Sequence, residues 1–366
     1  MIPRMTLPSS INQSELQSLS KFPVIGFKNQ NASHCYINAS MQALMCCEKF
    51  LRYIANSFAL SLCTKHVNGG LAPFMFAFVS LMTQAANLSK AHAHVAGSST
   101  PINILDHFPI AMLVDRARML RMDHFSAALQ RGGQQDADEF LDSMLQLVTN
   151  AEPICREFFK STQTIEMAGC SNCKQGASYR KESHFFARLQ VGDRYSGTVT
   201  VQQLLNTQSS SAPVVLCETC RRKSDRTTKT TWSTTSQYFI ISRTAGLNED
   251  QTELDMREVQ FDDKIQVSAA DVDTGVDTGG LITPSRRTLQ YKLLSEVVFI
   301  GEGSVSRGSS GHYYCIRHAQ KEMILLNDST TRRFKKRPTT GPDRGTVIAI
   351  YEQEDQLDDD DDDDED

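Results

Sequence analysis

Apolar residues in the first 160 positions recur with the spacing of helices. Behind Cys35 they fall three to four residues apart, which predicts a helix with one apolar face: Ile37, Met41, Leu44 and Met45. The polar stretch GGQQDADE precedes a second set with this spacing, which predicts a second helix: Phe140, Leu141, Met144, Leu145 and Val148. The apolar run at 71–82 is shorter than the about 20 residues that cross a bilayer, so we expect a buried helix there.

From about residue 161 the pattern changes to short runs of alternating or β-branched residues, which are typical of strands. The stretch at 262–287 is instead rich in Asp, Gly, Ser and Thr, and it predicts a long loop or insertion. The runs predict strands of a mostly antiparallel sheet: 183–191, 197–201, 236–244, 294–303, 311–319 and 345–353. Helices followed by antiparallel strands make an α+β fold the expected class.

The composition is that of a soluble globular protein. Hydrophobic residues make up 40% and charged residues 22% of the 366 positions, which argues against a disordered chain or a membrane protein. The length predicts one large domain with subdomains or about two domains. The first 20 residues hold no continuous apolar segment of a secretory signal, so we expect a cytoplasmic or nuclear protein that is not secreted.

That expected location decides how the ten cysteines are interpreted. A reducing compartment disfavours disulfides and favours metal ligation, catalysis or plain burial. It also makes the glycosylation sequons at Asn31 and Asn38 fortuitous, because such sites are modified in secreted proteins.

The charge is concentrated at the C-terminus. The net charge is −5, yet the last twelve residues hold ten acids, so the remainder carries about +5. A block of like charges repels itself, so we expect a disordered acidic tail at 354–366, solvated first and attractive to basic partners second. The basic run at 332–338 is either a nuclear localisation signal or, more commonly, a solvated loop.

Cys35 lies one or two residues before the apolar pattern of its helix. A thiol at a helix N-terminus lies at the positive end of the macrodipole, which favours the thiolate and is one route to a reactive cysteine. The alternative is a small buried residue, as we expect for Cys46 and Cys47 on the same helix. A cysteine nucleophile also needs an imidazole as base and a polar group that orients the imidazole.

A predicted hairpin near the C-terminus offers both groups. Its pattern indicates a strand that begins near His312, a turn, and a return strand that ends at Asn327 and Asp328. In an antiparallel hairpin the start of the first strand lies beside the end of the second, so His312 is expected next to Asn327 or Asp328. The alternative is an ordinary polar rim. His318 competes for the role of base, but it falls near the turn, at the other end.

Two CxxC pairs are separated by 43 residues: Cys170 and Cys173, then Cys217 and Cys220. Each pair can place two thiolates on one metal ion, and four thiolates make a closed tetrahedral Zn²⁺ site of structural type. The gap exceeds that of a compact zinc ribbon, so an inserted sheet is expected between the pairs, from the strands predicted at 183–191 and 197–201. Redox-active CxxC pairs are the alternative.

The segment at 132–141 opens a helix with polar residues crowded at its first turn: Gln134, Gln135, Asp136, Asp138 and Glu139. Acids at this place are stabilised by the helix dipole and cap free amide groups. A purely structural role therefore explains the spacing as well as a functional one does.

Taken in chain order, the cysteine segment, the QQDADEF helix, the two CxxC pairs, the GHY strand and the ND strand resemble the ubiquitin-specific proteases. These are papain-like cysteine peptidases that cleave ubiquitin conjugates, and the resemblance extends from about Gly26 to about Tyr351. It implies a right-hand architecture with a helical thumb, a β-rich palm, and β fingers tipped by zinc. The implied boundaries are a flexible lead-in at 1–20 and a catalytic domain at 21–353, divided into a thumb (24–160), fingers (161–236) and a palm (237–353, with the insertion at 262–287).

The resemblance also implies roles for individual residues. Cys35 resembles the nucleophile, His312 the general base and acid, and Asn327 the residue that orients the imidazole, with Asp328 in support. The oxyanion-stabilising residue matches Asn29 by motif, whereas counting back from Cys35 points to Gln30. The residues implied to line the cleft for the ubiquitin tail are Gln135, Asp136, Glu139, Gly311 and Tyr313.

The chain departs from the family pattern at three places. One extra residue stands between Gly26 and Cys35, and FIGEGS at 299–304 lacks a histidine that many members carry. His34 precedes Cys35 where threonine is usual, and its charge is expected to influence the thiolate.

The expected partners are ubiquitin and ubiquitinated proteins, with neither nucleic acid nor membrane. We expect a monomeric catalytic domain that other proteins recruit. Two alternatives remain at this point: a catalytically inactive ubiquitin-binding scaffold of the same fold, and a protease for a ubiquitin-like modifier.

Overall fold

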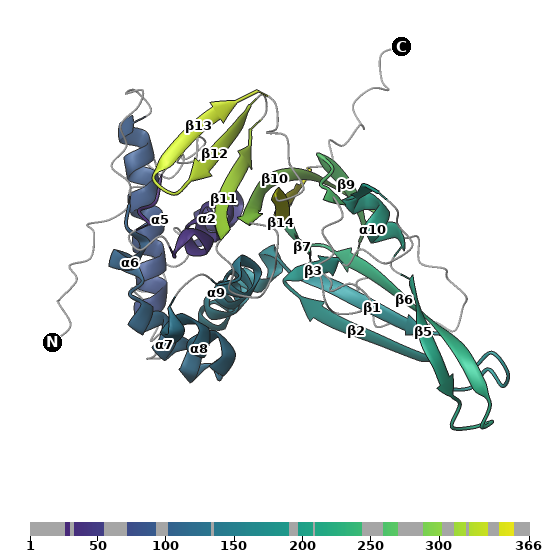
Figure 1. Cartoon of the computed structure of the whole chain (residues 1–366). Coiled ribbons are helices and arrows are strands. Elements are labelled where there is room, and N and C mark those ends of the chain that lie inside the picture. Colours follow the sequence, from purple (N-terminus) through teal and green to yellow (C-terminus); the bar gives the residue numbers. More distant parts are fainter. Residues whose placement is uncertain are drawn as a thin grey trace, which may run out of the picture. The chain divides into compact units, whose positions relative to one another are not determined.

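The structure is a computed structural model, and its described residues fall into two compact units (Figure 1). Unit 1 contains the residues up to 155 together with 310–338, and unit 2 contains 156–309 together with the residues from 339 onward. The lead-in expected at 1–20 lies outside the described residues, as do positions 270–287 of the insertion expected at 262–287 and positions 355–366 of the tail expected at 354–366. The described residues are 26–29, 33–54, 72–92, 102–132, 135–189, 197–207, 209–243, 259–269, 288–301, 311–319, 322–335 and 344–354.

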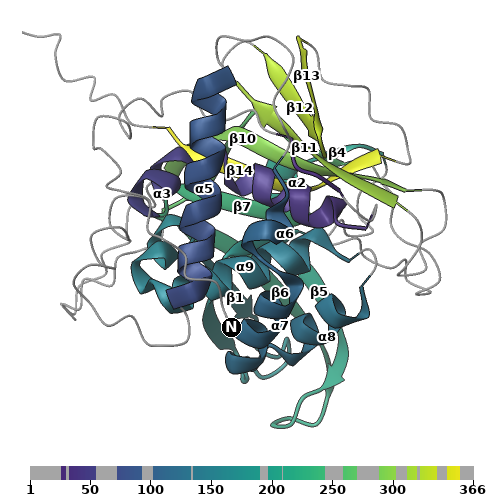
Figure 2. The same cartoon turned by 90° about the vertical axis from the view of Figure 1, so that its left-hand side faces the viewer.

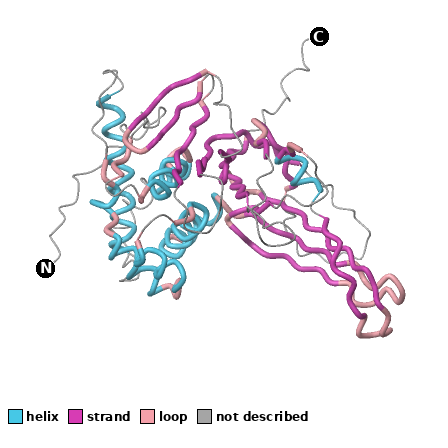
Figure 3. Tube along the Cα trace, viewed as in Figure 1, coloured by secondary structure: helices cyan, strands magenta, loops and turns pink. Residues whose placement is uncertain are grey.

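The described part of unit 1 combines helices with three antiparallel strands (Figure 3). The three helices expected from the apolar spacing are confirmed: α2 (Cys35–Leu44), α5 (Ala72–His92) and α9 (Ala137–Ala151). Its other described helices are α3 (Glu48–Tyr53), α6 (Ile104–His107), α7 (Ile110–Met119) and α8 (Asp123–Arg131). Among the described residues, no helix is both long enough and apolar enough to cross a membrane.

Aromatic contacts join the helices of unit 1 into one core. Tyr36 of α2 lies edge-on to Phe140 of α9, with ring centroids 5.6 Å apart, and Phe125 of α8 meets the same Phe140 at 6.1 Å. The long helix α5 packs beside α6 (Figure 2), and Phe74 lies 5.4 Å from Phe108. Every residue of α2 is buried. The helix that begins at Cys35 is therefore enclosed by apolar packing, which holds its position.

The hairpin expected near the C-terminus is present. Strand β11 (Gly311–His318) pairs antiparallel with β12 (Met323–Asn327), and the register sets Cys315 opposite Leu326. A third strand, β13 (Thr330–Phe334), pairs with β12 and was not expected, because its sequence TTRRF has no apolar alternation. The turn from β12 to β13 contains Asp328 at φ 47°, a left-handed conformation that Asp adopts more readily than most residues.

The described part of unit 2 consists mainly of strands, together with the helix α10. Its strands follow the order β10-β9-β6-β1-β2 in one sheet. In addition, β5 pairs with β6, and β14 pairs with both β10 and β7. Most of these pairs are antiparallel, as expected. The strands of this sheet are β1 (Ser161–Met167), β2 (Ser178–His184), β3 (Phe186–Leu189), β5 (Ser209–Leu216), β6 (Lys223–Thr234), β7 (Tyr238–Arg243), β9 (Lys264–Ser268), β10 (Thr288–Gly301) and β14 (Arg344–Gln353). The remaining elements are β4 (Val199–Thr200), β8 (Val259–Gln260), α10 (Val201–Thr207) and, at the boundary of the units, the 3-10 helix η3 (Pro153–Phe158).

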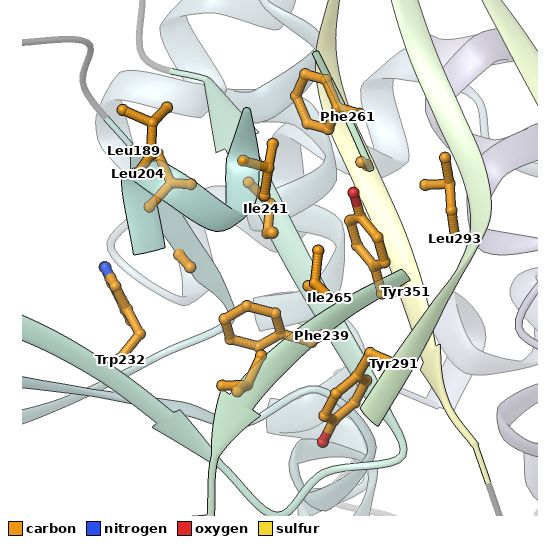
Figure 4. Packing of buried hydrophobic residues seen from close by; sticks show 14 of the residues in the cluster. Leu189, Leu204, Trp232, Phe239, Ile241, Phe261, Ile265, Tyr291, Leu293 and Tyr351 are labelled. Atoms are coloured by element: carbon orange, nitrogen blue, oxygen red, sulfur yellow. The ribbon is translucent and has the colours of Figure 1, made fainter. Parts of the chain in front are cut away.

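The core of unit 2 lies where β7, β9, β10 and β14 bring large side chains together (Figure 4). Phe239 and Tyr291 meet with ring centroids 5.9 Å apart. The Tyr291 hydroxyl donates to the Ser236 carbonyl at 2.7 Å, which satisfies its polar end inside the core. The mixture of helices and antiparallel strands confirms the expected α+β class.

Two sequence expectations are corrected in unit 2. The run at 197–201 is strand only at Val199 and Thr200, because α10 begins at Val201 and Thr200 caps it in a capping box. The Gln203 N–H donates to the Thr200 hydroxyl at 3.2 Å, and the Thr200 N–H donates to the Gln203 side chain at 2.9 Å. The stretch at 262–287 is not all loop, since β9 occupies 264–268 with Ile265 and Val267 buried in alternation.

A short segment before α2 ties the start of unit 1 to its hairpin. The Phe27 N–H donates to the Asp328 carbonyl at 2.8 Å, and the Lys28 N–H donates to the Ile102 carbonyl at 2.7 Å. Gly26 precedes these two residues and lies against the backbone of the turn between β12 and β13. The approach is so close that the segment fits only with a glycine at this place.

We expect Gly26→Ala to destabilise the protein by about 3 kcal/mol, at the upper end of overpacking effects. A Cβ at Gly26 would lie 2.5 Å from the Ser329 carbonyl oxygen, and backbone atoms cannot move aside as a flexible side chain can. Urea unfolding followed by circular dichroism measures the change. The control is Gly345→Ala, where the Cβ would meet only the flexible end of the Arg243 side chain, at 3.2 Å, so the change should stay below about 1 kcal/mol. Equal losses in the two variants would contradict the steric explanation.

Candidate active site and metal-binding cluster

The thiol singled out in the sequence is the first residue of α2. Cys35 is buried, and His34 occupies the N-cap position without making a side-chain capping bond. The N–H groups of a first helical turn have no partner within the helix. Cys35 therefore lies where the helix presents free donors and the positive end of its dipole.

The imidazole of His312 lies between the thiol and the end of β12. His312 is hydrogen-bonded to Cys35, and its Nε2 lies 2.6 Å from Oδ1 of Asn327 and 3.8 Å from Oδ2 of Asp328. Because Nε2 faces Asn327, the other ring nitrogen is the one left for the thiol. His318, the competing histidine, pairs with Met323 at the far end of the hairpin.

These neighbours change the protonation of His312. The hydrogen bond to Cys35 raises the pKa of His312 to about 9, and the Asn327 bond and the Asp328 charge act in the same direction. Partial burial of the ring opposes this change but does not outweigh it. The imidazole therefore carries a proton at neutral pH and faces a sulfur atom on one side and an amide oxygen on the other.

His34 behaves differently from the expectation that its charge influences the thiolate. The residue is 8% exposed, and burial lowers the pKa of its imidazole below the ordinary value. The ring is therefore neutral at pH 7, because burial disfavours the charged form. His34 supplies its backbone N–H to the site instead, through a bond to Asn29.

The Asp328 carboxylate is a meeting point for three chain segments. Its Oδ2 accepts from Asn29 Nδ2 at 3.0 Å, and its Oδ1 accepts from Asn38 Nδ2 at 2.7 Å. Its backbone carbonyl accepts from the Phe27 N–H. The turn that follows Asn327 is thus bonded both to the segment before α2 and to α2 itself.

Both the oxygen and the nitrogen of the Asn29 side-chain amide are hydrogen-bonded. Its Oδ1 accepts from the His34 N–H at 3.1 Å, and one Nδ2 hydrogen goes to Asp328. The second Nδ2 hydrogen is the donor that the group still has to offer. Gln30, the other position considered for this role, lies outside the described residues.

Asn38 was missed as part of the site. It was considered only as a fortuitous sequon, yet its side chain makes the shortest of the bonds to Asp328 and is 2% exposed. The available signal was its spacing, because a polar residue three positions after Cys35 shares the helix face of the thiol.

The start of α9 holds the residues implied to line the cleft. Asp136 is the N-cap, and its Oδ1 accepts from the Asp138 N–H at 2.8 Å. Gln135 Nε2 donates to the Gly132 carbonyl at 3.2 Å, and Glu139 is exposed. The structural role that the sequence left open for Asp136 is thus present in the fold.

The two hairpin residues implied to contact substrate lie at the start of β11. Gly311 is its first residue, one position before His312. The Tyr313 hydroxyl is hydrogen-bonded to the Ala137 backbone, and burial raises the pKa of this phenol. Tyr313 therefore connects β11 to the first turn of α9, within unit 1.

Unit 2 brings four sulfur atoms together. The Sγ atoms of Cys170, Cys173, Cys217 and Cys220 all lie within 4.8 Å of one another. Cys170 and Cys220 are 3.7 Å apart, and Cys173 and Cys217 are 3.6 Å apart. Four sulfurs at about 2.3 Å from one tetrahedral metal ion are about 3.8 Å apart, so the cluster can hold a metal ion.

The two halves of the cluster have the same local fold. The Lys174 N–H donates to the Cys170 carbonyl and the Arg221 N–H donates to the Cys217 carbonyl, each at 2.8 Å. Lys174 and Arg221 both adopt positive φ, at 60° and 59°. Each CxxC pair thus forms a tight knuckle whose backbone turn directs two sulfurs to one point.

Ser224 is a neighbour of the cluster that the sequence did not reveal. Its hydroxyl accepts from the Ser171 N–H at 2.9 Å and is 2% exposed. A hydrogen bond from Ser224 lowers the pKa of the Cys170 thiol. This favours the thiolate form in which cysteine binds metals.

The sheet expected between the CxxC pairs exists, but from other strands. The first knuckle joins β1 to β2, the second joins β5 to β6, and β1 pairs with β6. Only the first two residues of the run at 183–191 belong to this four-stranded part, at the end of β2. The run at 197–201 lies outside it.

Comparisons with known proteins identify the family of the chain. A family model described as ubiquitin carboxyl-terminal hydrolase matches residues 25–353. A search of curated proteins returned no match.

The fold is similar to that of a solved complex, the SAGA Ubp8/Sgf11/Sus1/Sgf73 DUB module bound to ubiquitin aldehyde. The TM-score is 0.62 at 13% identity, over 96% of this chain and 72% of that chain. A second structure of this module, bound to monoubiquitin, has a TM-score of 0.59 at 13% identity, over 97% and 73%. At such identity the likeness concerns the fold. The family match spans nearly all of the sequence, and the protein therefore belongs to the ubiquitin carboxyl-terminal hydrolase family.

Proposed function

We propose that this protein is a thiol-dependent deubiquitinase that cleaves the bond after the C-terminal glycine of ubiquitin in protein conjugates. The observation that carries the proposal is the hydrogen-bonded series Cys35, His312 and Asn327, with the last contact at 2.6 Å. A nucleophile, a base and a group that orients the base are the parts that thiol catalysis needs. Membership of the family supplies the substrate, and the ubiquitin-bound neighbours share the fold.

In the first step the Cys35 sulfur attacks the carbonyl carbon of ubiquitin's terminal glycine. The carbonyl π bond opens, and its electron pair forms an oxyanion. The imidazolium of His312 then gives its proton to the amine of the leaving lysine as the C–N bond breaks. The products of this step are a thioester on Cys35 and a free amine.

In the second step water hydrolyses the thioester. His312, now neutral, takes a proton from the attacking water while its Nε2 keeps the contact with Asn327. The C–S bond breaks, which restores the thiolate beside a protonated imidazole, and the released carboxylic acid of ubiquitin gives its remaining proton to solvent. Asn327 orients the ring through both steps without adding a charge.

The oxyanion needs donors that are already in place. We assign this role to the second Nδ2 hydrogen of Asn29 and to the free backbone N–H groups at the start of α2. Asn29 is suited to it because Asp328 and the His34 N–H hold its amide in one orientation. Preformed donors stabilise the charge as it develops, since no dipole has to reorient.

The start of α9 is the proposed contact surface for the ubiquitin tail. Asp136 and Glu139 place negative charge there, which suits the basic tail of ubiquitin. Gln135, Gly311 and Tyr313 complete the proposed set. The bonds of Asp136 to the helix and of Tyr313 to Ala137 hold this surface in shape.

The metal proposed for the four cysteines is Zn²⁺. Two sulfur pairs at 3.6 Å and 3.7 Å match the spacing of a tetrahedral thiolate site. With all four positions taken by protein ligands, such an ion stabilises structure and takes no part in the reaction. We place the catalytic domain at 21–353 and infer that other proteins recruit it, by analogy with the multi-protein module of the structural neighbours.

The first prediction tests the nucleophile. A ubiquitin with a C-terminal electrophile should form a covalent adduct with the wild-type protein, and Cys35→Ala should abolish the adduct and lower hydrolysis by about 10⁴-fold. Cys155→Ala is the matched control, because that buried thiol has a pKa raised to about 12 and takes no part. Ubiquitin binding without any adduct would show a scaffold, and reaction with a ubiquitin-like modifier alone would change the substrate.

The second prediction concerns pH. The proton on His312 is required by the leaving amine and is lost as pH rises through its pKa of about 9. Hydrolysis of a lysine-linked ubiquitin conjugate should therefore decline above about pH 9. Asn327→Ala removes one of the causes that raise this pKa, so the decline should move to lower pH. Circular dichroism checks that the fold persists, and an unmoved decline in Asn327→Ala would contradict the assigned role.

The third prediction concerns the metal. Metal analysis of the purified protein should find about one zinc per chain. Cys173→Ser should release the zinc and lower the melting temperature by about 4–8 °C, which corresponds to about 2 kcal/mol. In the hydrolysis reaction KM should rise by a larger factor than kcat falls, because the cluster holds no catalytic group. Cys155→Ser should keep its zinc, and a zinc-free wild type with full activity would refute the assignment.

A further inference from the structure

Asn38 joins the helix that carries the proposed nucleophile to the turn that follows the residue holding its base. Its Nδ2 donates to Asp328 Oδ1 at 2.7 Å and lies 3.4 Å from the Lys28 carbonyl. Its backbone N–H donates to the His34 carbonyl at 3.0 Å, as a helical bond. Both the side chain and the whole of α2 are buried.

The Asn38–Asp328 hydrogen bond lies close to both the sulfur of Cys35 and the residue that contacts His312. Asn38 lies three residues after Cys35, so the two side chains leave α2 on the same face about one turn apart. Asp328 directly follows Asn327, the residue that contacts His312 at 2.6 Å. The Asn38–Asp328 bond therefore closes a short path from the sulfur to the imidazole, within unit 1.

The bond also has the character of a rigid tie. An amide that donates to a carboxylate makes a charge-assisted hydrogen bond, which is stronger and shorter than a neutral one. The pair is protected from water on the Asn38 side, where the residue is 2% exposed. Asn29 and Asn38 take different oxygens of the carboxylate, so neither has to share its acceptor.

We propose that Asn38 is a positioning residue that sets the distance between Cys35 and His312 by fixing α2 to the Asp328 turn. This inference rests on the proposed function, and it adds a residue that contacts neither the sulfur nor the imidazole. Without the tie, apolar packing still encloses α2, but the bond that fixes its exact position against the Asp328 turn is gone, and an error of about 1 Å at a reacting pair can cost about 10²-fold in rate.

The experiment compares Asn38→Ala and Asn38→Asp with the wild type. Asn38→Asp keeps the side-chain shape but sets two carboxylates against each other at hydrogen-bond distance. We expect both variants to lower kcat for a ubiquitin conjugate by about 10- to 100-fold, with KM changed less than about threefold. The double variant Asn38→Asp with Asp328→Asn restores a donor and an acceptor in reversed order. It should recover at least about fivefold over Asn38→Asp alone.

A second readout reports the positions of the two groups without using activity. Histidine labelled at the ring carbon allows the titration of His312 to be followed by NMR, with His312→Gln identifying its signal. In the wild type this signal should titrate near pH 9, because of Cys35, Asn327 and Asp328. In Asn38→Ala the midpoint should fall, because the largest of these influences is lost when the sulfur moves away. Release of the Asp328 carboxylate alone would act in the opposite direction.

The matched control is Ser40→Ala. Ser40 is buried on the same helix, and its hydroxyl donates to the Ala137 carbonyl of α9 at 3.3 Å. We expect this variant to lose stability while kcat stays within about twofold and the His312 midpoint stays near pH 9.

The possible results distinguish the positioning role of Asn38 from the proposed deubiquitinase function. A lower melting temperature in Asn38→Ala with unchanged kcat and an unchanged His312 midpoint would show a merely structural bond and overturn the inference. If the wild type hydrolyses no ubiquitin conjugate while the His312 midpoint still falls in Asn38→Ala, the proposed function fails and the positioning role stands.

Discussion

The candidate site depends on one carboxylate. Asp328 accepts hydrogen bonds from Asn29 before α2 and from Asn38 within it, and its own backbone accepts from Phe27. These contacts join segments that are about 300 residues apart in sequence. A carboxylate is suited to this task because it has two oxygens with several acceptor directions and can hold more than one donor. At the left-handed backbone of Asp328, the turn presents Oδ1 to α2, and Oδ2 and the carbonyl to the segment before it.

The neighbouring residues Asn327 and Asp328 act on the imidazole of His312 in different ways. The neutral amide of Asn327 makes the 2.6 Å contact, whereas the charged carboxylate stays at 3.8 Å. A carboxylate in the nearer position would hold the proton more strongly, because opposite charges at short range favour the charged form. A general acid is most effective when its pKa lies near the working pH. The hydrogen bonds from the side-chain amides of Asn29 and Asn38 therefore hold the Asp328 carboxylate at a distance from which it supports the charge of His312 and still lets the proton leave.

Much of this arrangement could be predicted from the sequence, because it rests on local periodicity. The apolar spacing behind Cys35 located α2, and the alternation in the C-terminal hairpin placed His312 beside Asn327. Strand β13 was not predicted because four of its five residues are polar, and because its pairing comes from the neighbouring strand. Helix α10 was not predicted because the residues just before and at its start, Val199 to Val201, are β-branched like those of a strand. Only the capping box shows that a helix begins there.

The residues that were missed share another reason. Asn38 and Ser224 are single polar residues whose partners lie far away in the sequence, Asp328 in one case and Ser171 in the other. Periodicity shows which face of an element is buried, but it does not show which buried polar group will meet which partner. Such a group has to be hydrogen-bonded once it is buried, so its role becomes visible only when the fold supplies the partner.

The four-cysteine cluster extends the same reasoning to long range. Its two knuckles close separate hairpins, β1 with β2 and β5 with β6, and they share one end of the sheet because β1 pairs with β6. No knuckle alone can complete a tetrahedral site, so binding of a metal requires that the pairing between the hairpins has formed. Metal affinity is then also folding energy for this part of unit 2. The 43 residues between the pairs include strands β2 and β5, so pairing of the strands brings the two knuckles together. A metal ion at the tip can therefore hold together two hairpins that are distant in sequence and largely polar along their outer strand β2.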